Sequence, residues 1–435
     1  DNKDGVWTNN VLFGTIIRDK ERGKKLMRRK RNYNYSPYSR RRRIRWDNVL
    51  KVVIPVVVVL VLVITFNFSR IRLAMKGYSW SQQSAVLKLT SDKVKIVIDD
   101  DYLDHVDSWL KHSKDVKYYA DFEQYQSLHK KMKAADVVDT LSPMLDDQVP
   151  ALKKNGYTEK QIWTILKTAD SDDLDYILEK GYSYNTMKNY MAVSGFKFQD
   201  MDKYEEAYKS SKNYNYAVLS TSYPFIGDST KEATRHTITD PARYTTLVKK
   251  GLYLPSSYKP ADLVTPDKKY ITKKCDHPKL RKDAYKAFLA MRKAGEKEGY
   301  YIMINSGYRS YDEQSKIYKE YKQKWGELYA IQHVALPGAS EHQTGLGIDM
   351  SSESVDEGKR LVFGDTSEYK WACKNAHKYG FVLRFADGTS NITGITQEPW
   401  HFRYVGKKAA KIMYENNWTL EEYCLYTGDL PALKS

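Results

Sequence analysis

Cysteine is scarce in this chain of 435 residues. Three cysteines cannot close a disulfide framework, so the chain is not a small disulfide-stapled scaffold. Acidic charge is also in deficit, because 71 Lys and Arg stand against 54 Asp and Glu and give a formal net charge of +17. Apolar residues are not scarce: a content of 41% is near the globular average and excludes a wholly disordered chain. The length favours two or three domains.

The positive charge is concentrated at the amino-terminal end. Residues 1–48 contain 15 Lys and Arg and 5 Asp and Glu, which accounts for ten of the seventeen net charges. A segment this polar cannot bury enough apolar surface to order itself, so we predict a disordered basic tail over residues 1–48. A strongly basic chain raises the question of nucleic-acid binding, but the segment that follows gives these charges another role.

Long apolar runs are absent except for one. Residues 52–66 carry no charge, and flanking apolar residues extend the run to residues 49–68, close to the roughly 20 residues that a membrane span needs. No small-residue cleavage site follows, which disfavours a cleaved signal peptide, and a buried core segment is a weaker alternative. We therefore predict a single-pass signal anchor, with residues 1–48 cytoplasmic and the rest outside the cell. Nucleic acid is not an expected partner.

Helical patterning dominates residues 69–212. Residues 158–161, Thr-Glu-Lys-Gln, form a capping box, and Gly181 is a natural helix end. We interpret residues 69–212 as an all-helical extracellular stalk, with a wall-binding or partner-binding module as the alternative. Residues 213–239, rich in Ser, Thr, Tyr and Asn, are expected to form a linker or extended arm, and residues 240–435 the final domain.

A predicted strand over residues 300–305 runs into Ser-Gly-Tyr-Arg-Ser at residues 306–310. Residues 310–313 form a second capping box, which opens a helix that continues to about Trp325. Arg309 and Gln314 therefore lie at a strand-to-helix junction, where site residues commonly occur. The alternative for Arg309 is a structural role beside a buried carboxylate.

Two histidines and one aspartate are spaced as candidate metal ligands. His342 and Asp349 are separated by a loop with two glycines, and His401 lies in an alternating segment further along the chain. Three nitrogen and oxygen ligands leave a fourth position for water; zinc fits best, while Mn²⁺ and Co²⁺ remain compatible. Glu398, three residues before His401, is placed to take a proton from that water. Trp400 is interpreted as a pocket wall, with core packing as the equal alternative.

Three short motifs, taken in order, resemble the VanY-type D-alanyl-D-alanine carboxypeptidases and their L,D-carboxypeptidase relatives. They are S-G-Y-R-S at residues 306–310, S-x-H-x-x-G-x-x-x-D at residues 340–349, and E-x-x-H at residues 398–401. The resemblance covers roughly residues 245–425. It implies these roles: zinc ligands His342, Asp349 and His401; a catalytic base, Glu398; a partner for the oxyanion or the substrate carboxylate, Arg309; and peptide contacts, Gln314 and Ser340.

The resemblance also implies a substrate and a reaction. The substrate would be the peptidoglycan stem peptide, shortened at its C-terminal D-alanine by a D,D- or L,D-carboxypeptidase that uses Zn²⁺. A peptidoglycan endopeptidase of the same fold and a non-catalytic cell-wall-binding protein are the alternatives. For the fold we expect an α+β domain, with a small mixed or antiparallel sheet and helices on one face, preceded by the membrane helix and the helical stalk.

Overall fold

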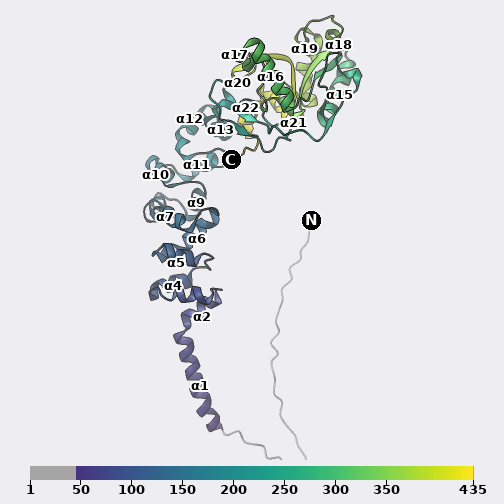
Figure 1. The fold of residues 1–435 in the computed structure, drawn as a ribbon. Coiled ribbons are helices and arrows are strands. Elements are labelled where there is room, and N and C mark those ends of the chain that lie inside the picture. Colours follow the sequence, from purple (N-terminus) through teal and green to yellow (C-terminus); the bar gives the residue numbers. More distant parts are fainter. Residues whose placement is uncertain (1–45, 435) are drawn as a thin grey trace, which may run out of the picture. The chain divides into compact units, whose positions relative to one another are not determined.

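The computed structural model describes residues 46–434. The chain divides into two compact units, Asp1–Met75 and Lys76–Ser435. The first unit contains α1 (Trp46–Phe66) and α2 (Phe68–Met75) (Figure 1). The predicted disordered tail lies outside the described residues, apart from its last three positions.

Helix α1 has the composition of a membrane span. Among residues 46–434, one helix is long and apolar enough to cross a membrane: the stretch Val49–Phe66 has a mean hydropathy of 3.0 and none of it is buried. The Thr65 hydroxyl donates to the carbonyl oxygens of Val61 and Leu62, each at 2.9 Å, so this polar group is satisfied within the helix. Such a helix fits a membrane anchor or a signal sequence.

The second unit begins with a series of short helices. They are α3 (Trp80–Val86), α4 (Ser91–Asp99), α5 (Val106–His112), α6 (Tyr119–Leu128), α7 (Ala134–Pro143), α8 (Val149–Lys154), α9 (Glu159–Ile165), α10 (Ser171–Lys180), α11 (Tyr184–Met191), α12 (Met201–Ser211), α13 (Tyr214–Ser222) and α14 (Pro224–Gly227). The capping box predicted at Thr158 opens α9, and Gly181 ends α10 with a φ of 67°, in the left-handed region that favours glycine.

The expected linker differs from the structure. Residues 213–239 contain α13 and α14, and Leu219, Phe225 and Ile226 are buried in a hydrophobic cluster together with residues of the C-terminal helices. The Asn213 side chain also donates to the carbonyl oxygen of Tyr426 at 3.1 Å. The composition of this segment suggested an extended arm because polar residues outnumber the apolar ones, and long-range burial overrides that local signal.

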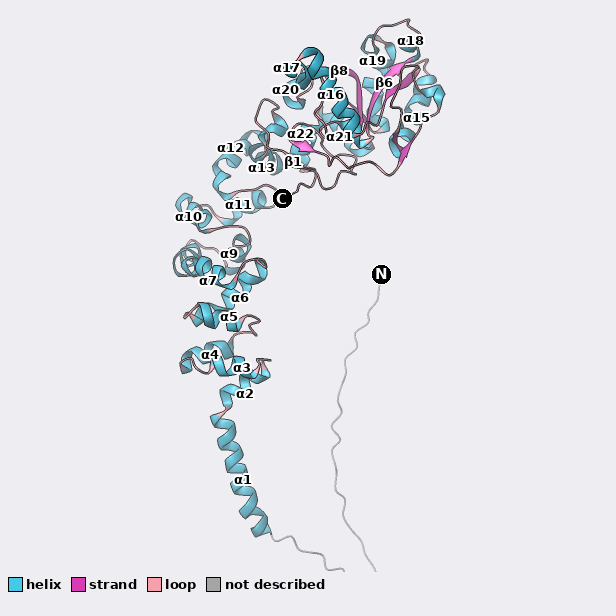
Figure 2. Ribbon diagram, viewed as in Figure 1, coloured by secondary structure: helices cyan, strands magenta, loops and turns pink. Residues whose placement is uncertain are grey.

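Strands occur in the part of the unit between residues 236 and 404 (Figure 2). They are β1 (His236–Thr237), β2 (Leu252–Tyr253), β3 (Leu263–Val264), β4 (Leu280–Arg281), β5 (Ile302–Ser306), β6 (Gly347–Ser352), β7 (Phe381–Phe385) and β8 (Glu398–Tyr404). Strands β5 to β8 form an antiparallel sheet in the order β5-β6-β8-β7, and the other four form two short pairs. The predicted combination of helices with a small sheet is confirmed.

One face of the four-stranded sheet packs against helices. The helices of this region are α15 (Lys282–Glu296), α16 (Tyr311–Trp325), α17 (Glu327–His333), α18 (Glu353–Asp356), α19 (Ser367–Asn375), α20 (Ser390–Thr393), α21 (Lys407–Asn416) and α22 (Leu420–Thr427). Ile348 of β6 and Phe402 of β8 share a buried core with Phe288 of α15 and Trp371 of α19. Because strand side chains alternate between faces, the neighbours of Ile348 and Phe402 point away from this core.

Candidate metal centre and active site

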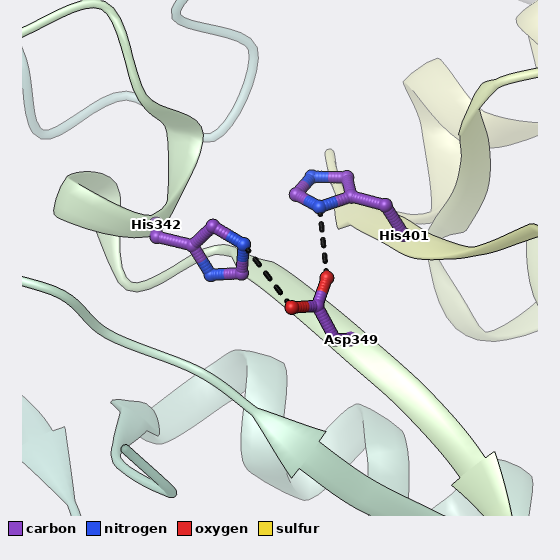
Figure 3. Close-up of side chains that lie close together, drawn as sticks. All are labelled: His342, Asp349 and His401. Carbon is purple, nitrogen blue, oxygen red and sulfur yellow. Dashed lines mark hydrogen bonds and ion pairs between the residues drawn. The ribbon is translucent and has the colours of Figure 1, made fainter. Parts of the chain in front are cut away.

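The sheet places Asp349 and His401 side by side. Asp349 of β6 pairs with His401 of β8, one position away from the core pair Ile348 and Phe402. Directly opposed residues on antiparallel strands share a face. The two side chains therefore meet on the face away from α15, where His401 Nδ1 lies 3.0 Å from Asp349 Oδ1 (Figure 3).

His342 reaches the same point from the turn that precedes β6. It lies in the 3₁₀ helix η5 (Glu341–Thr344), which ends at Gly345 with a φ of 65°. The backbone conformation favours glycine there, and a Cβ at Gly345 would also lie 2.9 Å from the Leu263 side chain, which would have to shift. His342 Nδ1 donates to the Gly307 carbonyl oxygen at 2.7 Å, and Nε2 lies 3.5 Å from Asp349 Oδ2 (Figure 3).

These three side chains fit a divalent cation. One ligand atom from each of His342, Asp349 and His401 lies within 4.8 Å of the others, and all three residues are buried. Two imidazoles and a carboxylate are a donor set typical of Zn²⁺. The second nitrogen of each imidazole faces an oxygen of the protein, Gly307 O for His342 and Glu341 Oε2 for His401, which is how metal-binding histidines are usually oriented.

Burial and charge set the protonation of this cluster. Burial, together with the charge of Arg309, lowers the pKa of His342 to about 4, so its ring is neutral at pH 7 as metal binding requires. Burial opposes the charge on His401, but Asp349 and Glu341 outweigh it and raise the His401 pKa to about 9. Burial also opposes the charge of Asp349, yet the two histidines hold its pKa well below the ordinary value. A bound cation would take the place of the proton on His401.

Glu398 approaches His401 where the pairing of β7 with β8 is irregular. Leu383 and Phe385 are two residues apart on β7, whereas their partners Phe402 and Glu398 are four residues apart on β8. Two extra residues therefore bulge out of β8. In a regular strand, residues three apart face opposite sides, but here Glu398 Oε2 lies 3.8 Å from His401 Nδ1.

Glu398 is poised for proton transfer. Burial, together with the charge of Asp349, raises the pKa of Glu398 to about 7, while its side chain keeps 19% exposure. A carboxyl with a pKa near neutrality both accepts and returns a proton readily. A perturbed carboxyl beside a buried histidine pair is typical of a catalytic site.

Arg309 lies beside the candidate metal ligands and is oriented by its neighbours. Arg309 Nη2 lies 3.8 Å from Asp349 Oδ2, and Nη1 donates to Gln314 Oε1 at 2.9 Å. Gln314 Nε2 in turn donates to the Ala335 carbonyl oxygen at 2.8 Å. Both ends of the Gln314 amide are therefore engaged by the protein and orient Arg309, and the substrate contact expected of Gln314 stays a prediction.

All eight residues singled out in the sequence line one cavity, with a volume of about 530 Å³. Ser340 is 3% exposed and Trp400 is 38% exposed, so Trp400 contributes to the open rim rather than to the core. Residues 229–231 also line this cavity, although they precede the predicted domain. The eight predicted residues that the structure brings together are up to 92 positions apart, from Arg309 to His401.

Buried charges beside this cavity were missed by sequence reasoning. Glu341 Oε1 accepts from Arg384 Nε at 2.8 Å and lies 2.8 Å from Arg403 Nη1, and Arg384 forms a two-pronged pair with Glu421. The position of Glu341 directly before His342 was the signal available in the sequence. The sequence around Arg384, Arg403 and Glu421 contains no motif that would have indicated their burial.

Comparison with known proteins places this chain among carboxypeptidase-like hydrolases. The family model described as VanY, D-alanyl-D-alanine carboxypeptidase, matches residues 277–407. The chain is 43% identical over 216 residues to the putative carboxypeptidase YodJ of Bacillus subtilis, which covers 49% of this chain and 79% of YodJ. It belongs to the VanY family of D-alanyl-D-alanine carboxypeptidases.

Two further similarities cover smaller parts of the chain. A D-alanyl-D-alanine carboxypeptidase of Enterococcus faecium is 44% identical over 126 residues, covering 29% of this chain and 37% of that protein. A solved structure of the L,D-carboxypeptidase LdcB is 45% identical, covers 45% of this chain and 92% of that one, and has a TM-score of 0.42.

Proposed function

We propose that this protein is a membrane-anchored zinc metallopeptidase that removes the C-terminal D-alanine from peptidoglycan stem peptides. The observation that carries the proposal is the buried group of His342, Asp349 and His401, with Glu398 Oε2 3.8 Å from His401 Nδ1 at the same cavity. The carboxypeptidase names of its relatives support the reaction class.

The chain's own residues divide the chemistry. Zinc held by His342, Asp349 and His401 would supply Lewis-acid polarisation of the scissile carbonyl group. Glu398 Oε2 accepts a proton from the attacking water and returns it to the leaving amine of D-alanine, so the protons balance over one turnover. The Arg309 guanidinium offsets the negative charge that develops on the carbonyl oxygen or binds the substrate's terminal carboxylate. Ser340 and Gln314 line the peptide path, and Trp400 forms part of its rim.

The anchor and its orientation belong to the same proposal. The hydropathy of 3.0 over Val49–Phe66 supports a single span, and the basic residues before it favour a cytoplasmic amino terminus. Residues 69–212 would then form the extracellular helical segment and residues 240–435 the catalytic domain, with α13 and α14 packed in the segment between them. The cell wall would be the site of action.

Products of defined peptides test this function. The full chain, purified in detergent and loaded with zinc, is incubated with a stem tetrapeptide and a stem pentapeptide, and the products are weighed by mass spectrometry. Loss of one D-alanine is expected, and the peptide that reacts distinguishes L,D from D,D cleavage. Cleavage inside the stem would identify an endopeptidase, and no cleavage would identify a binding protein. His342→Ala should lose both zinc and activity.

A further inference from the structure

A chain of buried, charged side chains ends at the candidate metal ligand His401. We name Glu341, Arg384 and Glu421 the buried ion chain. Glu421 of α22 accepts from Arg384 Nη1 and Nη2 at 2.9 and 2.7 Å, and Arg384 Nε donates to Glu341 Oε1 at 2.8 Å. Glu341 Oε2 then lies 3.5 Å from His401 Nε2. The chain thus links a C-terminal helix to the second nitrogen of His401.

Hydrogen bonds fix the orientation of the side chains in the buried ion chain. Glu421 occupies both terminal nitrogens of Arg384, so only Nε is directed at Glu341. The arginines hold Glu341 by Oε1, which leaves Oε2 for His401. Within residues 46–434, neither Glu341 Oε2 nor His401 Nε2 forms a hydrogen bond with any other group. Glu421 therefore fixes, at two removes, the carboxylate that faces His401.

Stability alone is a weak reason to keep these charges. The side chains of Glu341, Arg384 and Glu421 are 2%, 1% and 0% exposed. Burying an ion costs several kcal/mol even when it is paired, and apolar residues of similar volume often serve stability as well or better. Oriented carboxylates next to metal-binding histidines, in contrast, tune ligand orientation and basicity.

The charge balance around the site depends on Glu421. Arg384, Arg403 and Lys249 lie against Glu341 and Glu421, with Lys249 Nζ 3.9 Å from Glu421 Oε1. Three basic groups thus face two carboxylates. Loss of the Glu421 charge would leave one carboxylate, Glu341, against these three basic groups. The added positive field would weaken the binding of a divalent cation at the neighbouring site.

We propose that Glu421 is a positioning residue for the metal centre, acting on His401 through Arg384 and Glu341. The proposal rests on the proposed zinc site, and it adds a residue that lies beyond residues 277–407 of the family match. Orientation and charge act in the same direction: both weaken cation binding when Glu421 is neutral.

A pair of adjacent glutamates gives the test its control. Glu421→Gln removes the charge from the buried ion chain. Glu422→Gln makes the same chemical change one residue later in α22, where Glu422 Oε2 accepts instead from the backbone N–H and hydroxyl of Thr419 at 2.8 and 2.9 Å. Zinc affinity of the full chain in detergent is measured by competition with a chromophoric chelator. Glu421→Gln should weaken it about tenfold, within the range known for residues that orient metal ligands, and Glu422→Gln should leave it unchanged.

A spectroscopic readout separates positioning from general destabilisation. The visible spectrum of the cobalt-substituted protein reports ligand geometry, and it should change in Glu421→Gln but not in Glu422→Gln. Glu421→Asp keeps the charge and should recover part of the affinity. Wild-type zinc affinity in folded Glu421→Gln, or equal weakening in Glu422→Gln, overturns the proposal.

If Glu421→Gln does not fold, a double variant tests the same proposal. Arg384→Gln combined with Glu421→Gln removes both charges of the pair, and it should still bind zinc more weakly because Glu341 loses one of its two arginine partners. Wild-type affinity in this double variant also overturns the proposal. Absence of zinc binding by the wild-type chain would instead overturn the proposed function itself, and this inference with it.

Discussion

The helical region (residues 80–211) and the sheet region (residues 246–427) bury different kinds of polar group. Within the described residues, the buried polar side chains of the helical region are glutamines, such as Gln83 and Gln126, whereas the sheet region buries ions such as Arg384 and Glu421. The Gln83 amide nitrogen donates to the Tyr78 carbonyl oxygen at 2.6 Å, so a backbone group satisfies this donor. Buried ions need counter-ions, and Arg384 and Glu421 provide them for each other.

The two regions also differ in the range of their contacts. In the helical region, Tyr118 donates to Asp146, 28 positions away, and links one group of helices to the next. In the sheet region, Arg403 donates to the Thr246 carbonyl oxygen, 157 positions away. The helical region is therefore built from contacts between segments that are close in the sequence. The sheet region, with its cavity, depends on contacts between residues far apart in the sequence. Changes in the first should affect stability, and changes in the second should affect activity.

The largest expected effect is the loss of the base in the sheet region. Glu398→Gln keeps the size of the side chain but removes the proton acceptor, so kcat on a stem peptide should fall about 10³-fold while the zinc content stays unchanged. Glu415→Gln in α21, at an exposed position, is the matched control. Zinc is measured by atomic absorption in the same preparation. Activity within tenfold of wild type in Glu398→Gln would remove Glu398 from the proposed mechanism.

A core truncation in the helical region should change stability without changing chemistry. Leu174 of α10 is 0% exposed, and Leu174→Ala should lower the free energy of unfolding by about 3 kcal/mol through the cavity it leaves. Leu178→Ala, the same change at a half-buried position of α10, should cost less. Urea unfolding gives both values, and kcat of the folded variants should stay within twofold of wild type. A large loss of kcat in Leu174→Ala would show that the two regions are coupled.

The smallest expected effect concerns an acid in the helical region. Burial, with the charge of Glu159, raises the pKa of Asp121 from 3.8 to about 6. Between these two values the folded chain keeps a proton that the unfolded chain has released, so this group's contribution favours folding at low pH and is lost as the pH rises through 6. Asp121→Asn should therefore stabilise the protein more at pH 7 than at pH 4.

Unfolding midpoints in urea at these two pH values measure that difference. Asp139→Asn, which removes an exposed charge from α7, is the control. A gain for Asp121→Asn that is larger at pH 4 than at pH 7 would contradict the assigned shift.

Local signals in the sequence predicted much of the fold. The capping boxes at Thr158 and Ser310 open α9 and α16, and the strand predicted over residues 300–305 corresponds to β5. These features depend on residues within one or two turns of each other, so the sequence contains the whole interaction. The prediction of an extended arm over residues 213–239 differs from the structure, which has α13 and α14 there. The residues that bury these two helices lie in the C-terminal helices, far away in the sequence.

The candidate site also combines features that the sequence predicted with features that only the tertiary structure shows. Sequence spacing and the family resemblance identified His342, Asp349, His401 and Glu398, and the structure places all four at one cavity. Spacing did not predict how Glu398 faces His401, because residues three apart on a regular strand face opposite sides, and the pairing of β7 with β8 is irregular at this point. The role proposed for Glu421 was also beyond the sequence.

The sequence by itself determined the apolar helix, the basic segment before it, the capping boxes that open α9 and α16, and the choice of candidate site residues. Each of these is encoded within a few neighbouring positions. Only the tertiary structure decided the register between β6 and β8, the bulge at Glu398 and the buried ion chain from Glu421 to His401. Ion pairs and strand registers join residues that are far apart in the chain, and their energy depends on the burial that folding creates.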